Sequence, residues 1–292
     1  MNNAIISKVI SESLLSIYPV FIKKLQLATN LQLSVRLIIY LIISLFFCNF
    51  AFIKKYIFHK NVIILGLINL LHIYSSYKGF ELLESGLSYT LFYTYPIFIL
   101  LLTGTPFSIT ILISLLGVFI LTKNEFKNGI SYKGLIMIFL AAFTEALIYY
   151  FIRIIPTKNN WNHLFLTYFY GTIIIISYYI YKYFNNRNKD LDKDKVEIKS
   201  QKNVNYKVFI ALIVNGIIGS FGYYLRFYST TRLRPFIYAI LSYLGIFMSF
   251  IYGIIFNKEK ITVNKIVGSI LIFIGAKKEL YQPIKNIIKY IY

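Results

Sequence analysis

Two acidic residues lie inside long apolar stretches of this chain, where an ionised side chain is costly. Glu12 follows Ser11 and Glu145 follows Thr144, each more than one helical turn from the nearer end of its stretch. Charged groups in such surroundings are rare and mark ligand sites or proton relays, because burial makes protonation of a carboxyl accessible. Each glutamate could therefore bind a cationic group or a proton. The alternative is structural pairing with a base, for which Lys8, one turn before Glu12, is a local partner.

Three further ionisable residues interrupt apolar stretches. Arg36 could receive a substrate carboxylate or phosphate through both arms of its guanidinium, or extend its charged end to polar surroundings with its stem buried. His72 is the most interior of several polar residues at helical spacing, whereas Lys78 and Glu81, near the end of that stretch, are expected to form a solvated pair. Arg226, late in its own stretch, is either a cavity cation or an anchor at the interface.

Aromatic residues are too numerous for most of them to contact a ligand. The chain has 27 Tyr and 26 Phe, so the majority are expected to pack or to form interfacial belts. Tyr93, Tyr95, Tyr149 and Tyr224 are candidates for lining a site because they lie near the candidate polar groups. Pro96 frees a backbone carbonyl and permits a helix to bend, which would suit a moving gate or a static kink.

The sequence contains no pattern typical of a metal site, a cofactor site or a catalytic site. Cys48 is the only cysteine, and His59, His72 and His163 are far apart, so we expect neither a disulfide nor a metal site. No nucleophile stands near a base, so we expect no catalytic residue, no cofactor and no enzyme. The net charge of +20 is scattered through short connections without a dense basic patch, and nucleic-acid binding is not expected.

The elements that must position these residues are ten apolar stretches, most of them 15 to 23 residues long. About 20 apolar residues are what a helix needs to cross a bilayer. The composition agrees, with 58% hydrophobic and 14% charged residues and a mean hydropathy of +0.65. We therefore predict an all-α membrane protein with ten transmembrane helices. The predicted spans are 3–22, 31–53, 61–80, 85–103, 106–122, 133–154, 163–183, 206–228, 235–256 and 262–276.

The connections are short, with one exception. Residues 184–205 are mixed in charge and nearly free of apolar residues, which predicts a mobile, solvated loop. The tail, residues 277–292, could lie in the membrane interface as a short amphipathic helix. The basic residues do not decide which side of the membrane each connection faces. Lys8 and Glu12 interrupt the first stretch, which is therefore expected to be a span and not a cleavable signal.

The chain divides into two sets of five spans, residues 1–128 and 129–292. Weak likeness between them supports repetition: the glutamate of each first span precedes a base, and Tyr89 and Tyr238 stand at an offset of 149 in the fourth and ninth spans. Chance likeness of apolar segments is the alternative. Because each half has an odd number of spans, the two five-helix repeats would be inverted, a plan that places a substrate site between them near the midplane.

Several motifs resemble those of the drug/metabolite transporter superfamily, in particular its EamA-like branch. The fourth span runs from SGLSY at 85–89 to YPIF at 95–98, and Arg36 stands in the second span. The end of the chain has LRP at 233–235, KEKI at 258–261 and GSILIFIG at 268–275. The first half departs from this pattern, with TGTP at 103–106 in place of an acidic loop. The resemblance covers the whole chain and implies a ten-helix carrier that works by alternating access.

The residues and the resemblance together predict a secondary transporter of a small polar or zwitterionic metabolite, with proton coupling left open. Its cavity would lie among spans 1, 3, 4, 6, 8 and 9, and its membrane would be the plasma (inner) membrane. An exporter of organic cations or drugs is the alternative within transport. A membrane-embedded lipid-modifying enzyme and a membrane scaffold or receptor are alternatives of other classes. The expected partners are a small molecule and the lipid bilayer, and nothing indicates an oligomeric state.

Overall fold

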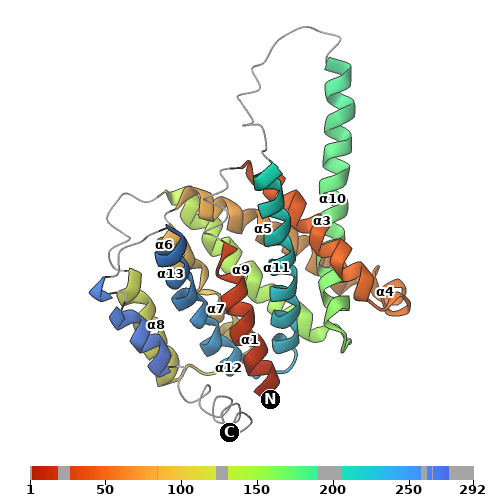
Figure 1. Ribbon diagram of the computed structural model, residues 1–292. Helices are drawn as coiled ribbons and strands as arrows, with labels where there is room; N and C mark the ends of the chain where they lie inside the picture. The colour runs from red at the N-terminus through yellow and green to blue at the C-terminus, as the bar shows by residue number, and fades with distance from the viewer. Residues whose placement is uncertain are drawn as a thin grey trace.

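The computed structural model describes residues 2–18, 27–83, 85–122, 131–189, 206–257, 262–264 and 266–275, and these residues contain helices and no strand (Figure 1). The helices lie side by side in one bundle, beyond which the end of α10 projects. They are α1 (Asn2–Leu15), α3 (Thr29–Phe47), α4 (Phe50–Tyr56), α5 (Lys60–Leu82), α6 (Ser85–Phe92), α7 (Tyr95–Leu102), α8 (Ile109–Thr122), α9 (Tyr132–Ile154), α10 (Asn160–Lys189), α11 (Tyr206–Thr230), α12 (Pro235–Ser242), α13 (Leu244–Asn257) and the unlabelled helix Ile266–Gly275.

Each of the ten predicted apolar stretches coincides with a helix or a pair of helices. Six helical segments are long and apolar enough to cross a membrane: Thr29–Phe47, Lys60–Leu82, Tyr132–Ile154, Asn160–Asn185, Val208–Thr230 and Pro235–Phe256. Three stretches are divided, the second between α3 and α4. The fourth is broken into α6 and α7 around Tyr93 and Thr94, and the ninth into α12 and α13 at Tyr243.

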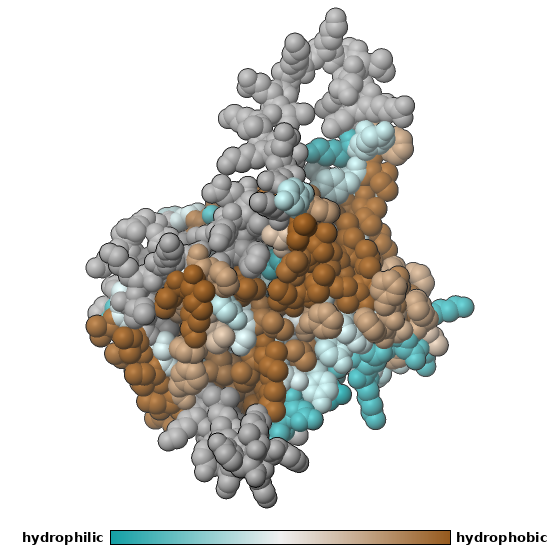
Figure 2. Space-filling model, viewed as in Figure 1, coloured by the Kyte–Doolittle hydropathy of each residue, from teal (hydrophilic) through white to brown (hydrophobic). Residues whose placement is uncertain are grey.

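The outward faces of the helices are apolar. Phe46, Ile109, Phe119 and Ile136 are each more than 60% exposed, and Figure 2 shows apolar side chains over much of the visible face. A water-soluble protein rarely exposes so large a patch, whereas hydrocarbon chains accommodate it. Serine, threonine and asparagine side chains are buried instead, many of them hydrogen-bonded to a carbonyl of the preceding turn, as Ser75 is to Leu71. The chain is an integral, multi-pass membrane protein.

Small residues set how closely the helices approach. α5 packs along α9, where a Cβ added to Gly79 would lie 2.9 Å from the Ile138 side chain. α8 packs against helix Ile266–Gly275, where a Cβ on Gly117 would lie 2.6 Å from the carbonyl oxygen of Gly268. A side chain at either glycine would push the paired helices apart.

The helices pair in a definite pattern. α1 lies along α11 and α5 along α9, while α3 contacts both α10 and α11 (Figure 1). α12 packs against α7 and α1, and α6 against α9 and α13. The polar residues of α1, α5, α9 and α11 therefore face one another in the middle of the bundle.

Two predicted boundaries differ from the structure. The second span, predicted as 31–53, ends at Phe47, because the side chain of Asn49 accepts a hydrogen bond from the Phe52 N–H and starts the separate helix α4. The loop predicted to begin at residue 184 starts later, because α10 continues to Lys189. The rest of 184–205, the tail 277–292 and the connections at 124–129 and 258–260 lie outside the described residues.

Candidate functional site

A buried arginine joins two carboxylates from different parts of the chain. Arg226 of α11 donates from Nη1 to Glu145 of α9 at 2.5 Å and from Nη2 to both oxygens of Glu12 of α1, at 3.0 and 3.1 Å. The three side chains are at most 4% exposed. Buried charges need partners of opposite sign, and the planar guanidinium fork can serve two carboxylates at once.

Glu12 has three further partners. Lys8, one turn earlier in α1, forms an ion pair with it and also lies 3.5 Å from the centre of the Tyr238 ring. The hydroxyls of Tyr93 and Tyr95 donate to the same carboxylate at 2.8 and 3.3 Å. The two tyrosines reach one carboxylate because the break between α6 and α7 falls between them. Every oxygen of Glu12 is thereby satisfied.

Gly245, at the start of α13, makes room for this arrangement. A Cβ at that position would lie 1.9 Å from the Tyr93 hydroxyl and 2.8 Å from a Glu12 oxygen. Its carbonyl oxygen also accepts a hydrogen bond from Ser16 at 2.8 Å, which holds the end of α1 against α13. A residue with any side chain would displace the tyrosine from the carboxylate.

His72 of α5 approaches the second carboxylate. Its Nε2 lies 3.3 Å from Oε2 of Glu145, and its Nδ1 lies 3.0 Å from the carbonyl oxygen of Ala141. A carbonyl can only accept, so Nδ1 carries a proton. Oε2 of Glu145 has no hydrogen-bond partner among the described residues, so a proton taken up between Nε2 and Oε2 would join the two side chains.

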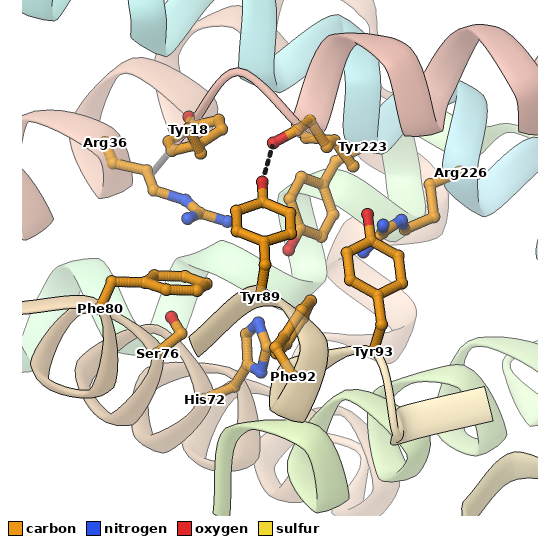
Figure 3. A pocket seen from close by; sticks show the side chains of 11 residues that line it. Tyr18, Arg36, His72, Ser76, Phe80, Tyr89, Phe92, Tyr93, Tyr223 and Arg226 are labelled. Atoms are coloured by element: carbon orange, nitrogen blue, oxygen red, sulfur yellow. Dashed lines mark hydrogen bonds between the residues drawn. The ribbon is translucent and has the colours of Figure 1, made fainter. Parts of the chain in front are cut away.

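A cavity adjoins the ion cluster of Lys8, Glu12, Glu145 and Arg226. It holds about 380 Å³ of space outside protein atoms, part of it open to the surroundings, and Figure 3 shows the side chains around it. Arg226 and His72 lie on its wall, and Arg36 lies across from them. Most of the remaining wall is aromatic, and a hydrogen bond from Tyr89 to the Leu15 carbonyl joins α6 to the end of α1.

The structure brings most of the predicted site residues together. The candidates placed in the ion cluster or on the cavity wall are Glu12, Arg36, His72, Tyr93, Glu145 and Arg226, and Tyr95 hydrogen-bonds to Glu12 of the cluster. Tyr149 lies farther out, where its hydroxyl accepts from Arg153 and its ring packs on Tyr238. Tyr224 stacks on Trp161, away from the cavity wall. Pro96 stands in the first turn of α7, directly after the break.

Several residues that line the cavity were not among the predicted site residues. Tyr223, and not its neighbour Tyr224, lines the cavity, together with Tyr18, Ser76, Phe80 and Phe92. The helical spacing held a partial signal, because Ser76 follows His72 by four residues and Tyr223 precedes Arg226 by three. Within the described residues no group of three His, Cys, Asp or Glu side chains could hold a metal ion.

Comparisons with known proteins agree with this architecture. Residues 132–276 match the model of the EamA-like transporter family, part of the drug/metabolite transporter superfamily, which confirms the resemblance read from the motifs. A solved structure described only as a crystal structure of a protein has a TM-score of 0.64 with this chain at 14% identity, over 94% of this chain and 95% of the other. At that identity the likeness concerns the fold alone. No curated protein matches the chain.

Proposed function

Because this chain belongs, through residues 132–276, to the EamA-like transporter family, we propose that it is a secondary transporter of a small polar metabolite. Ten helices in two inverted halves would expose the cavity to each side of the plasma (inner) membrane in turn. One proton would move with each transport cycle. The observation that carries the proposal is the buried bridge of Arg226 to Glu12 and Glu145, beside a cavity and between the two halves.

The helix contacts support the inverted repeat. An inverted repeat makes α1 equivalent to α9, α5 to α11, α6 to α12 and α7 to α13. Under this equivalence the packed pair α1–α11 corresponds to the packed pair α9–α5, and the pair α12–α7 corresponds to the pair α6–α13. At the far end, Gly117 meets Gly268, and Gly275 meets the carbonyl of Thr110. The sequence offset of 149 carries the α6–α7 break onto the α12–α13 break. Three pairs of contacts and one sequence offset thus follow the same exchange of halves.

The bridge suggests how movement would be controlled. Glu12 belongs to the first half, whereas Glu145 and Arg226 belong to the second, so the halves cannot separate at this point without breaking an ion pair in a medium of low dielectric constant. A substrate or proton that replaces a lost partner lowers that barrier. Uptake of a proton by His72 and Glu145 would do this, because a neutral Glu145 holds Arg226 less strongly.

Substitution of Glu145 by glutamine tests the transport function. The variant keeps the shape and the hydrogen-bonding groups but carries no negative charge and cannot exchange the proton. Purified protein in liposomes would be given a ¹³C-labelled metabolite extract, with accumulated compounds identified by mass spectrometry under an imposed pH gradient. We expect gradient-dependent accumulation with the wild type and a loss of at least about tenfold with Glu145→Gln.

Glu81→Gln is the matched control. Glu81 forms an exposed pair with Lys78 at the end of α5 and does not line the cavity, so its substitution should leave accumulation unchanged. Unchanged accumulation by a folded Glu145→Gln protein would contradict the assignment. Accumulation by neither the wild type nor the control would contradict transport itself.

Export of organic cations is less well supported than uptake of a metabolite. Both carboxylates that could attract a cation already have basic partners, Glu12 with Lys8 and Arg226, and Glu145 with Arg226. Among the residues that the structure describes, Arg36 is the cation on the cavity wall without an acidic partner, and it would repel a cation.

A further inference from the structure

Arg36 is a buried guanidinium that no carboxylate neutralises in the part of the chain that the structure describes. It is 6% exposed, and it belongs to none of the ion pairs formed by Glu12, Glu81 and Glu145. Nη2 donates to the hydroxyl of Tyr168 at 3.2 Å, and Nε has no partner. Four tyrosine rings lie 4.8 to 5.8 Å from the guanidinium carbon: Tyr18, Tyr40, Tyr77 and Tyr223.

A cation in this position calls for an anion. Arginine does not lose its proton in proteins, so burial cannot neutralise it. Tyrosine faces attract a cation, and a desolvated pair contributes on the order of 2 kcal/mol, but they do not cancel its charge. A charge held inside a membrane without a counter-ion remains costly. Arg36 lies on the cavity wall, where an anion from outside can reach it.

The surrounding charges limit what that anion can be. In the neighbouring ion cluster, the positive charges of Lys8 and Arg226 offset the negative charges of Glu12 and Glu145. With Glu145 ionised and His72 neutral, Arg36 therefore leaves one uncompensated positive charge beside the cavity among the residues that the structure describes. A singly charged, planar group that takes two parallel N–H donors matches it best, and a carboxylate has both properties. A dianionic phosphate would leave one negative charge unpaired.

The rest of the wall indicates the body of such a molecule. Phe80 lies below Arg36 and Phe92 beside His72 in Figure 3, and Leu15 also lines the cavity. These three side chains would bury an apolar group of the ligand.

We propose that Arg36 binds the carboxylate of the transported substrate, which is therefore a small organic acid or an amino acid with an apolar body. This inference rests on the proposed transport function, since it assigns the substrate class of the same cavity. The ion cluster then acts as the proton-sensitive element between the halves, while Arg36 selects what enters.

Binding to the purified protein in detergent tests the proposal without transport. The probes are 3-phenylpropanoate and acetate, each compared with its neutral amide of the same shape, and methyl phosphate. Thermal unfolding and titration calorimetry are the readouts. We expect 3-phenylpropanoate to raise the melting temperature and to bind at least about tenfold more tightly than its amide, with methyl phosphate weaker than either carboxylate.

Variants show whether Arg36 is the cause. Arg36→Met should remove the preference for carboxylate over amide, Arg36→Lys should keep it with weaker binding, and Arg232→Gln, which changes an exposed arginine, should leave it intact. If Arg36→Met does not fold, the wild type and Arg36→Lys still decide the matter. A purely structural arginine would give no preference in any of them.

The proposal is overturned if no carboxylate binds, if acid and amide bind equally, if methyl phosphate binds most tightly, or if folded Arg36→Met keeps the preference. None of these results affects the Glu145→Gln uptake experiment, which uses unselected metabolites. Carboxylate binding without any accumulation in liposomes would instead contradict transport and leave the Arg36 site standing.

Discussion

Arg226 is the residue whose loss should most damage the folded protein. It neutralises Glu12 and Glu145 at once, and Glu145 has His72 as its remaining partner. Removing one member of a buried ion pair leaves an uncompensated charge and typically costs about 3–5 kcal/mol. We expect Arg226→Met to lower the free energy of unfolding by about that amount, measured by denaturant titration in detergent micelles.

Two further variants provide comparisons for the denaturant titration of Arg226→Met. A double change, Arg226→Met with Glu145→Gln, removes one cation and one carboxylate together, so it should recover part of the lost stability. Arg232→Gln changes an exposed arginine in the connection that follows α11, and it should change stability by no more than about 0.5 kcal/mol. Stability of Arg226→Met equal to the wild type would show that the bridge is absent in solution.

The residue types in the sequence identified members of the ion cluster, but they did not determine which faces of the helices contact one another. Glu12, Arg36, His72 and Glu145 were identifiable because ionisable groups are rare in apolar stretches. Choosing Tyr224 and not Tyr223 was a matter of direction, since neighbouring residues on a helix point roughly 100° apart and both are tyrosine.

The lengths of the apolar stretches predicted where most helices begin and end, but they did not predict the breaks within the fourth and ninth stretches. The fourth and ninth stretches contain no charged residue, so hydropathy predicts continuous spans, and neither division follows from apolar length. Pro96 was a usable signal for the first division, because it has no N–H to bond the carbonyl of Phe92. No proline accompanies the division at Tyr243.

Pro96→Ala tests what the first break contributes. Alanine restores the N–H and favours one continuous helix, which would carry Tyr93 and Tyr95 away from the shared carboxylate of Glu12. We expect a folded protein whose initial rate of accumulation in liposomes falls by about tenfold.

Pro235→Ala is the appropriate comparison for this change. Pro235 also stands in the first turn of a helix, α12, but it begins that helix after a connection and not at a break. Its substitution should leave the rate within about twofold of the wild type. Equal rates for Pro96→Ala and the wild type would mean that the break serves only packing.

At the scale of the whole molecule, the paired contacts and the central cavity predict that the same cavity opens to both sides. Ser76 lies on the cavity wall, is 4% exposed and carries a hydroxyl close in size to a thiol. In a protein whose single native cysteine is replaced, Cys48→Ser, the change Ser76→Cys places one thiol in the cavity. A rigid pore-less scaffold would shield that thiol from both sides, and a receptor would expose it to one side at most.

Alternating access makes a different prediction for that thiol. In oriented liposomes, a membrane-impermeant maleimide should label Ser76→Cys from the outside under one direction of the pH gradient and from the inside under the other, because proton uptake by His72 and Glu145 would bias the two states. Ser114→Cys, fully buried between α8 and helix Ile266–Gly275, should stay unlabelled under both conditions. Labelling of Ser76→Cys from one side only, whatever the gradient, would exclude alternating access, because the two populations it requires would not exist.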